Sequence, residues 1–128
     1  IIHLHGYLND IDIIPFFDKA NVGVAFSPKT EYYSNNILTK LYEYLLSGIP
    51  TITIPTPDNK RVINEINGVL IEDNDHSFAD GLHLIAQRFT KYSSAEIMKT
   101  VEKESIQYQV KYNIVPTFNN IIDEIENN

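Results

Sequence analysis

The sequence predicts an α/β fold, in which a parallel sheet of about four strands carries helices on both faces and is followed by a C-terminal helical tail. Four short apolar runs rich in β-branched residues punctuate the first 72 positions, and helical patterns lie between them. After position 71 the apolar residues follow a helical period to the end. Strands that alternate with helices form parallel sheets covered on both faces, so the first part of the chain is expected to be a parallel α/β core.

The predicted strands occupy residues 1–5, 22–26, 51–54 and 69–71. Asn67-Gly68 is a strong turn signal directly before the last of them. Because a helical pattern separates each strand from the next, all four are expected to be parallel.

Capping residues and prolines locate the first helix, and a short helix lies between the last two strands. The first is expected within residues 10–20, with Asp10 or Asp12 as its cap and Pro15 in its first turns, where a missing N–H does little harm. The short helix is expected at residues 60–65.

The helix at residues 38–47 has the clearest pattern. Gly48 follows it, where a left-handed residue is wanted after a helix, and Ile49-Pro50 comes next. One face carries apolar residues at helical spacing: Leu38, Leu41, Tyr42 and Leu45.

Three helices are predicted after the last strand. Asp75 can cap the first, and Ser93 with Glu96 has capping-box spacing at the start of the second. Pro116 suits the first turn of a terminal helix. The first of these helices lays an apolar face against the sheet, formed by Phe78, Leu82, Ile85, Ala86 and Phe89.

Length and composition indicate one folded domain over residues 1–128, divided into an α/β core at 1–90 and a helical tail at 91–128. The net charge of −7 argues against nucleic acid and anionic membrane surfaces as partners. The absence of cysteine excludes disulfides, thiol catalysis and thiolate zinc sites, and it suits a cytoplasmic protein. The chain starts in an apparent strand without Met, so it is expected to be part of a longer protein.

Ligands of open α/β sheets bind beyond the carboxyl ends of the strands. The segments there are residues 5–7, 27–36 and 55–59, of which the second is the longest and most polar. It runs into the helix at 38–47, so backbone N–H groups at the helix start can hold a phosphate. The residues expected to supply this site are Asn35, Asn36, Ile37, Leu38 and Thr39.

Lys40, Glu43 and Ser47 share the helix face opposite the apolar stripe. A carboxylate at this place can accept two ribose hydroxyls, and an ammonium one turn earlier can neutralise a diphosphate. The same spacing is typical of an ordinary solvated helix face with a weak ion pair. Spacing alone leaves both interpretations open.

The run NILTKLYEYLLSGIP at residues 36–50 resembles a segment of the GT-B glycosyltransferases of the GT4-like type (glycosyl transferases group 1), N-x-x-x-K-L-[YF]-E-Y-[LM]-A-x-G-x-P. The likeness covers roughly residues 1–90. Its flanks are similar to that family's glycine-ended strand, its Leu-Pro-x-Tyr helix, its Asp-Val-Gly-Leu strand and its Asn-Gly-x-Leu-[IV] turn; the matching segments are IIHLHG, IIPFF, NVGV and NGVLI.

The resemblance implies a Rossmann-like half domain that binds a nucleotide-sugar donor. Glu43 would hold the ribose hydroxyls, and the helix start would meet the diphosphate. Many relatives have a second Glu near the donor sugar, where this chain has Asn35. Either Glu31 reaches in from a longer loop, or Asn35 makes neutral hydrogen bonds to the sugar. Gly6 matches the glycine that ends the family's strand.

The family's diphosphate-binding Arg and Lys, and its acceptor-binding N-terminal domain, have no counterpart here. The resemblance therefore implies the donor side of an enzyme that transfers a sugar to a surface polysaccharide or glycolipid acceptor, with no cofactor, no metal and no confidently assigned catalytic residue. This portion would be inactive alone. The whole protein would lie in the cytoplasm, either free or peripheral to the inner face of the membrane. In the strand order 3-2-1-4-5-6, residues 1–5 would touch none of the other three strands, and the exposed edges would favour self-association.

Two other functions stay open at this point. One is a non-catalytic α/β binding or regulatory module, which Asn35 in place of Glu favours and Lys40 with Glu43 opposes. The other is a nucleotide-sugar epimerase of GT-B architecture. His3 and His5 alternate onto one strand face, but the sequence offers no third metal ligand near them, so no metal site is expected.

Overall fold

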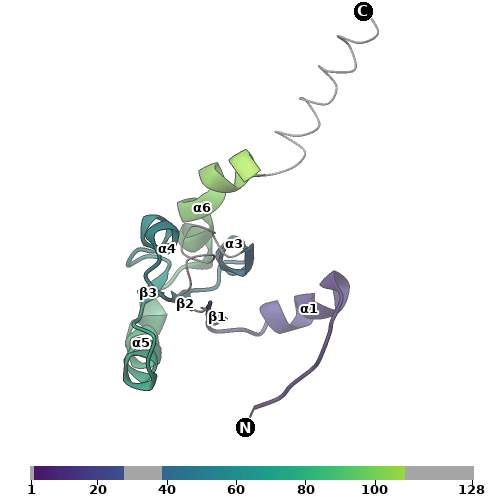
Figure 1. The fold of residues 1–128 in the computed structure, drawn as a ribbon. Coiled ribbons are helices and arrows are strands. Elements are labelled where there is room, and N and C mark those ends of the chain that lie inside the picture. Colours follow the sequence, from purple (N-terminus) through teal and green to yellow (C-terminus); the bar gives the residue numbers. More distant parts are fainter. Residues whose placement is uncertain (1, 28–38, 109–128) are drawn as a thin grey trace, which may run out of the picture.

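The computed structural model describes residues 2–27 and 39–108, which form an α/β fold around a parallel sheet (Figure 1). The strands are β1 (Gly23–Ala25), β2 (Thr51–Thr53) and β3 (Gly68–Leu70), in the order β1-β2-β3. Both pairings are parallel, with Val24 opposite Ile52 and Ile52 opposite Val69. Three of the predicted strands are thus confirmed as parallel; β1 and β2 are shorter than predicted, and β3 has the predicted length but begins one residue earlier.

The predicted first strand is not formed. The described part of this segment, residues 2–5, lies outside the sheet, with Ile2 88% and Leu4 93% exposed. A strand is stable only where a neighbour satisfies its backbone groups. This segment was expected not to neighbour the other strands, and in the structure it lies to one side of the sheet (Figure 1).

Helix α1 (Asp10–Phe17) follows the N-terminal segment. Its first helical residue is Asp10, which was predicted as a possible cap before the helix. Its cap is Asn9, whose Oδ1 accepts the backbone N–H groups of Ile11 at 3.1 Å and Asp12 at 3.0 Å. The Asp10 and Asp12 assignments were therefore wrong, because a neighbouring residue with the same short acceptor occupies the cap. Phe17 at the helix end stacks at a tilt on Tyr44, with ring centroids 5.3 Å apart.

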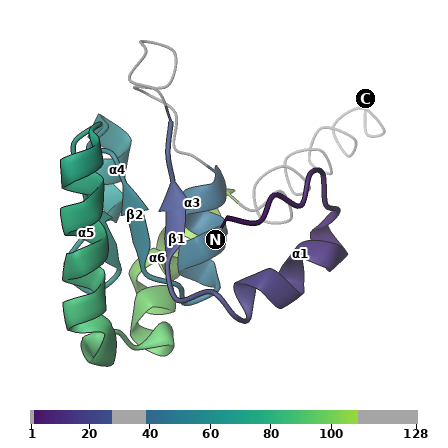
Figure 2. The same cartoon turned by 90° about the horizontal axis from the view of Figure 1, so that it is seen from below.

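Helices cover both faces of the sheet (Figure 2). Helix α5 (Asp75–Arg88) lies on one face, where Ile85 packs with Ile52 and Ile71. The other face carries α3 (Thr39–Leu46), α4 (Pro57–Val62) and α6 (Ser94–Tyr108). A short 3₁₀ turn, η1 (Phe89–Lys91), connects α5 to the approach of α6.

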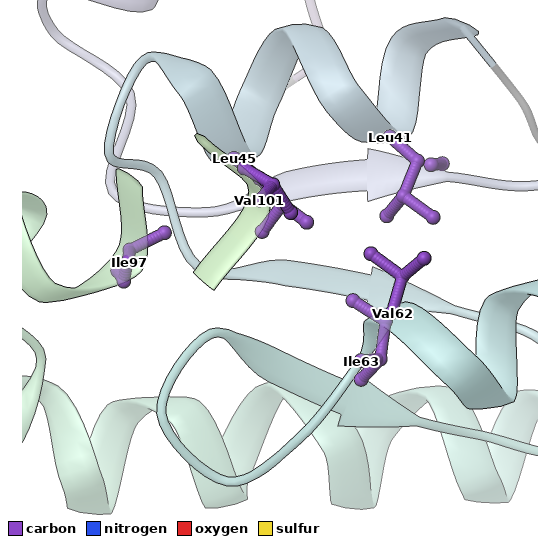
Figure 3. Close-up of a cluster of buried hydrophobic side chains, with 7 residues drawn as sticks. Leu41, Leu45, Val62, Ile63, Ile97 and Val101 are labelled. Atoms are coloured by element: carbon purple, nitrogen blue, oxygen red, sulfur yellow. The ribbon is translucent and has the colours of Figure 1, made fainter. Parts of the chain in front are cut away.

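The larger part of the core lies between these helices and the sheet (Figure 3). Side chains from α3 and α6 meet those at the end of α4 and the inward face of β1. Fully burying such aliphatic side chains stabilises the fold by about 1.5–3 kcal/mol each, which is why three short strands suffice. The buried members are Ala25, Leu41, Leu45, Val62, Ile63, Ile97 and Val101.

Turn and cap chemistry fixes the remaining boundaries. Gly48 has a φ of +72°, the left-handed conformation predicted for it after the helix expected at 38–47, and a Cβ there would lie 2.5 Å from the Cβ of Ser94. Helix α4 begins at Pro57, earlier than predicted, because Thr56 caps it by accepting the N–H of Asn59 at 3.1 Å.

The cap of α5 is Asn74, whose Oδ1 accepts the N–H of Ser77 at 2.9 Å, so the Asp75 assignment was wrong. The predicted helix after Pro116 lies outside the described residues.

Candidate functional site

Helix α3 starts at the edge of the sheet where β1 ends, which is the edge where parallel sheets bind ligands (Figure 2). Thr39, Lys40 and Glu43 are exposed on this helix, whereas Leu41 and Leu45 are fully buried. The structure thus places the three described α3 candidates on an accessible face of a helix whose other face is fixed by the core.

Of the other predicted site residues, the structure describes Gly6 alone. Glu31, Asn35, Asn36, Ile37 and Leu38 lie outside the described residues. Gly6 has a φ of +68° and lies in the exposed N-terminal segment, where a Cβ built on it would meet no atom within 4 Å.

Contacts on the side of α3 that faces β1 fix its position. A Cβ on Gly23 would lie 2.5 Å from the Tyr44 ring, so only glycine lets the helix approach the strand this closely. Burial raises the pKa of the Tyr44 phenol above its usual value, and the neighbouring carboxylate of Glu43 adds to the rise. The close packing of Tyr44 therefore fixes the position of the preceding residue, Glu43, on the helix.

A second polar group lies at the same edge of the sheet, and it is buried. Thr53 Oγ1 donates to the carbonyl oxygen of Ala25 at 2.7 Å, which joins the ends of β2 and β1. Asn59 Nδ2 donates to Thr53 Oγ1 at 2.9 Å and to the carbonyl oxygen of Ile54 at 3.0 Å. Because the Thr53 hydroxyl uses its proton on Ala25, it accepts from Asn59, and this fixes which end of the amide faces it.

Two atoms of this edge have no hydrogen-bond partner among the described residues. They are Asn59 Oδ1 and Ser27 Oγ, in side chains that are 1% and 3% exposed. Buried polar side-chain atoms are generally hydrogen-bonded in folded proteins, so each exception calls for an explanation. Tyr92 Oη is also buried, but beside Arg88, whose positive charge offsets part of the rise in pKa that burial causes.

The sequence interpretation located the segments that carry these atoms, residues 27–36 and 55–59, at the carboxyl edge. It did not single out Ser27, Thr53 or Asn59 as site residues. A usable signal was present, since Thr-Ile-Thr is an unusually polar sequence for a central buried strand.

The described surface also has hollows away from this edge. One, of about 500 Å³, lies beside β1 on the α5 face and has no ionisable lining, being formed by Asn21, Val22, Leu82, Ile85, Ala86 and Phe89. No group of three or more potential metal ligands occurs in the described part of the chain. His3 stacks on His5 with centroids 6.4 Å apart, and His5 contacts the Phe16 ring at 4.5 Å.

Within residues 2–27 and 39–108, no helix is long and apolar enough to cross a membrane. Comparisons with protein-family models, curated proteins and solved structures gave no match to this chain. A functional assignment therefore rests on the residues and their geometry.

Proposed function

We propose that this chain is the donor-side, nucleotide-sugar-binding portion of a GT-B glycosyltransferase that transfers a sugar to a surface polysaccharide or glycolipid acceptor. The observation that carries the proposal is the placement of α3. Its start lies at the carboxyl edge of a parallel sheet, with Lys40 and Glu43 exposed on the face opposite its buried leucines. The resemblance of residues 36–50 to the family segment supports the same assignment.

The proposed roles follow from the charges along α3. The Glu43 carboxylate accepts hydrogen bonds from the ribose hydroxyls, which are charge-assisted and stronger than neutral ones. Lys40 lies nearer the helix start, where its ammonium group and the backbone N–H groups of the first turn attract a diphosphate. Together they stabilise the negative charge that develops on the departing diphosphate as the sugar is transferred.

The proposal includes a partner and a location. A further domain binds the glycan or lipid-linked acceptor, and the whole enzyme works in the cytoplasm, free or at the inner face of the membrane. No cofactor or metal takes part. A non-catalytic α/β binding or regulatory module that has lost the donor site is the second candidate, and Asn35, which replaces the Glu of many relatives, is the observation that favours it.

Glu43→Gln in the full-length protein tests the donor site. The substitution keeps the shape of an exposed side chain and removes a charge-assisted hydrogen bond worth about 1.5–3 kcal/mol. At about 1.4 kcal/mol per decade, affinity for a nucleoside diphosphate should fall roughly tenfold to a hundredfold. Calorimetric titration with the diphosphates of uridine, guanosine, adenosine and thymidine measures this change.

Two control variants separate the site from the scaffold. Glu65→Gln removes the same charge from an exposed position outside α3 and should leave affinity unchanged. Leu45→Ala removes fully buried packing and should cost about 2–5 kcal/mol of stability. If the parent binds a diphosphate and Glu43→Gln binds it equally well, Glu43 is an ordinary solvated residue and the donor-site assignment is wrong.

A further inference from the structure

The carboxyl edge holds two buried polar atoms without a hydrogen-bond partner among residues 2–27 and 39–108, Ser27 Oγ and Asn59 Oδ1. They lie at the edge where β1 and β2 end, the same edge at which α3 begins. Their presence there is independent of the exposed charges of α3 on which the proposed function depends. Spare hydrogen-bonding capacity at a ligand-binding edge points to a role in the ligand complex.

The register shows that both atoms belong to the same face of the sheet. Ala25 packs in the core cluster on the side of α3, α4 and α6, and Thr53 is its partner across the β1–β2 pair. Ser27 comes two residues after Ala25, so the alternation of an extended chain places it on that side. Asn59 reaches the same place from α4 by donating to Thr53 Oγ1.

The chemistry of the two atoms restricts what they bind. Asn59 Nδ2 is occupied by Thr53 and Ile54, so the amide presents only its carbonyl oxygen, an acceptor. The Ser27 hydroxyl can donate or accept. A phosphate oxygen is itself an acceptor and would face Asn59 Oδ1 unfavourably. A neutral hydroxyl or an N–H group matches the pair.

We propose that Ser27 Oγ and Asn59 Oδ1 bind neutral hydroxyl or N–H groups of the nucleotide sugar whose diphosphate meets α3. This inference rests on the proposed function and adds a specificity contact to it. No described hydrogen bond holds Ser27 Oγ, so the side chain can turn about χ1 toward a ligand without breaking one. The preceding residue, Phe26, is 47% exposed, which places this part of the chain close to the surface.

Ser27→Ala in the full-length protein tests the contact. Because the hydroxyl has no hydrogen-bond partner among the described residues, the melting temperature should stay the same or rise. Affinity for uridine diphosphate glucose, or for the matching sugar of whichever diphosphate the parent binds, should fall about threefold to tenfold, as expected for one neutral hydrogen bond. A loss confined to the sugar nucleotide identifies a sugar hydroxyl, and an equal loss with the diphosphate alone identifies a group on the nucleoside; both support the proposal.

Thr51→Val is the matched control. Its hydroxyl is equally buried but lies at the start of β2, where it donates to the carbonyl oxygen of Ile49 at 3.1 Å. This variant should lower the melting temperature and leave the affinity of the folded protein unchanged. The opposite pattern in the two variants separates a ligand contact from a structural hydrogen bond.

Three results would overturn the inference. A lower melting temperature for Ser27→Ala would show that the fold uses the hydroxyl. Unchanged affinity for both ligands, while Glu43→Gln weakens binding, would leave the donor site standing and show that the two atoms hold at most a water molecule. A parent protein that binds none of the nucleotides would remove the proposed function and this contact together.

Discussion

Two buried asparagines, at opposite edges of the sheet, use their side chains differently. Asn67, before β3, donates through Nδ2 to the carbonyl oxygen of Val62 at 2.9 Å and to Thr100 Oγ1 at 2.8 Å. Its Oδ1 accepts the N–H of Asn64 at 2.8 Å. Asn59, after β2, also donates twice, but its Oδ1 has no described partner.

The difference separates an edge where the amide of a buried asparagine is fully hydrogen-bonded from an edge where a buried amide oxygen has no described partner and can accept a hydrogen bond from a ligand. At the amino edge, the Asn67 amide closes a turn and joins it to α6. At the carboxyl edge, Asn59 Oδ1 and Ser27 Oγ are buried without a hydrogen-bond partner in the part of the chain that the structure describes, and a buried polar atom without a partner lowers stability. Sites that break a local rule of stability are commonly functional sites.

The largest effect is expected at the amino edge. Asn67→Ala removes three hydrogen bonds and leaves the carbonyl of Val62 without this donor, so the free energy of unfolding should fall by about 2–4 kcal/mol. Urea denaturation measures it. Asn64→Ala is the control, because Asn64 is exposed and its side chain accepts only the N–H of Ile66 at 2.9 Å among the described bonds. If Asn67→Ala loses no more stability than Asn64→Ala, the hydrogen bonds of Asn67 do not stabilise the amino edge, and the proposed difference between the two edges is wrong.

A smaller loss is expected for Thr53→Val at the carboxyl edge. The change keeps the shape of the side chain, but it removes the bond to Ala25 and one acceptor of Asn59, at a cost of about 1–3 kcal/mol. Thermal and urea unfolding of Thr53→Val and Ser27→Ala compare the loss of stability in the two variants, since both changes remove a buried hydroxyl. Equal stability changes in the two variants would contradict the distinction between used and unused hydroxyls.

The smallest effect concerns Tyr92, where burial raises the phenol pKa and Arg88 lowers it in part. Arg88→Met should raise this pKa further. Because the folded pKa is above the unfolded value of about 10, the contribution of this phenol to stability is complete below pH 10 and is lost as the pH rises through the folded pKa.

Ultraviolet titration of the tyrosines, with Tyr92→Phe as the reference that identifies this one phenol, measures the change. An unchanged or lower Tyr92 pKa in Arg88→Met would show that the guanidinium does not serve the buried hydroxyl.

Local patterns predicted the parts of the fold that local chemistry decides. The spacing of leucines and the following Gly48 located α3, and Asn67-Gly68 located the start of β3. The caps of α1 and α5 were missed because Asn and Asp stand side by side at both places, and either side chain can cap a helix. Residues 1–5 have the composition of a strand, but pairing depends on a neighbour, which composition does not reveal.

The candidate site also has one part that local sequence patterns predicted and one part that they did not. Helical spacing predicted the exposed face that carries Lys40 and Glu43, because it needs only the period of one helix. Whether the side chains of Ser27 and Asn59 find hydrogen-bond partners depends on the bond between Thr53 and Ala25, which are 28 positions apart. Whether a buried polar atom is satisfied follows from such long-range contacts, so the sequence alone did not identify this pair.

The parallel order of the sheet also affects how fast the site forms. Parallel neighbours are joined by crossovers and never by a tight hairpin, and β1 pairs with β2 only after the chain has passed through α3. Non-local pairing of this kind slows folding. The start of α3 reaches its place beside β1 in the same step, so we expect the proposed nucleotide binding to be regained in the slowest refolding phase. Stopped-flow refolding with and without nucleotide would show binding in an earlier phase if the helix assembled independently of the sheet.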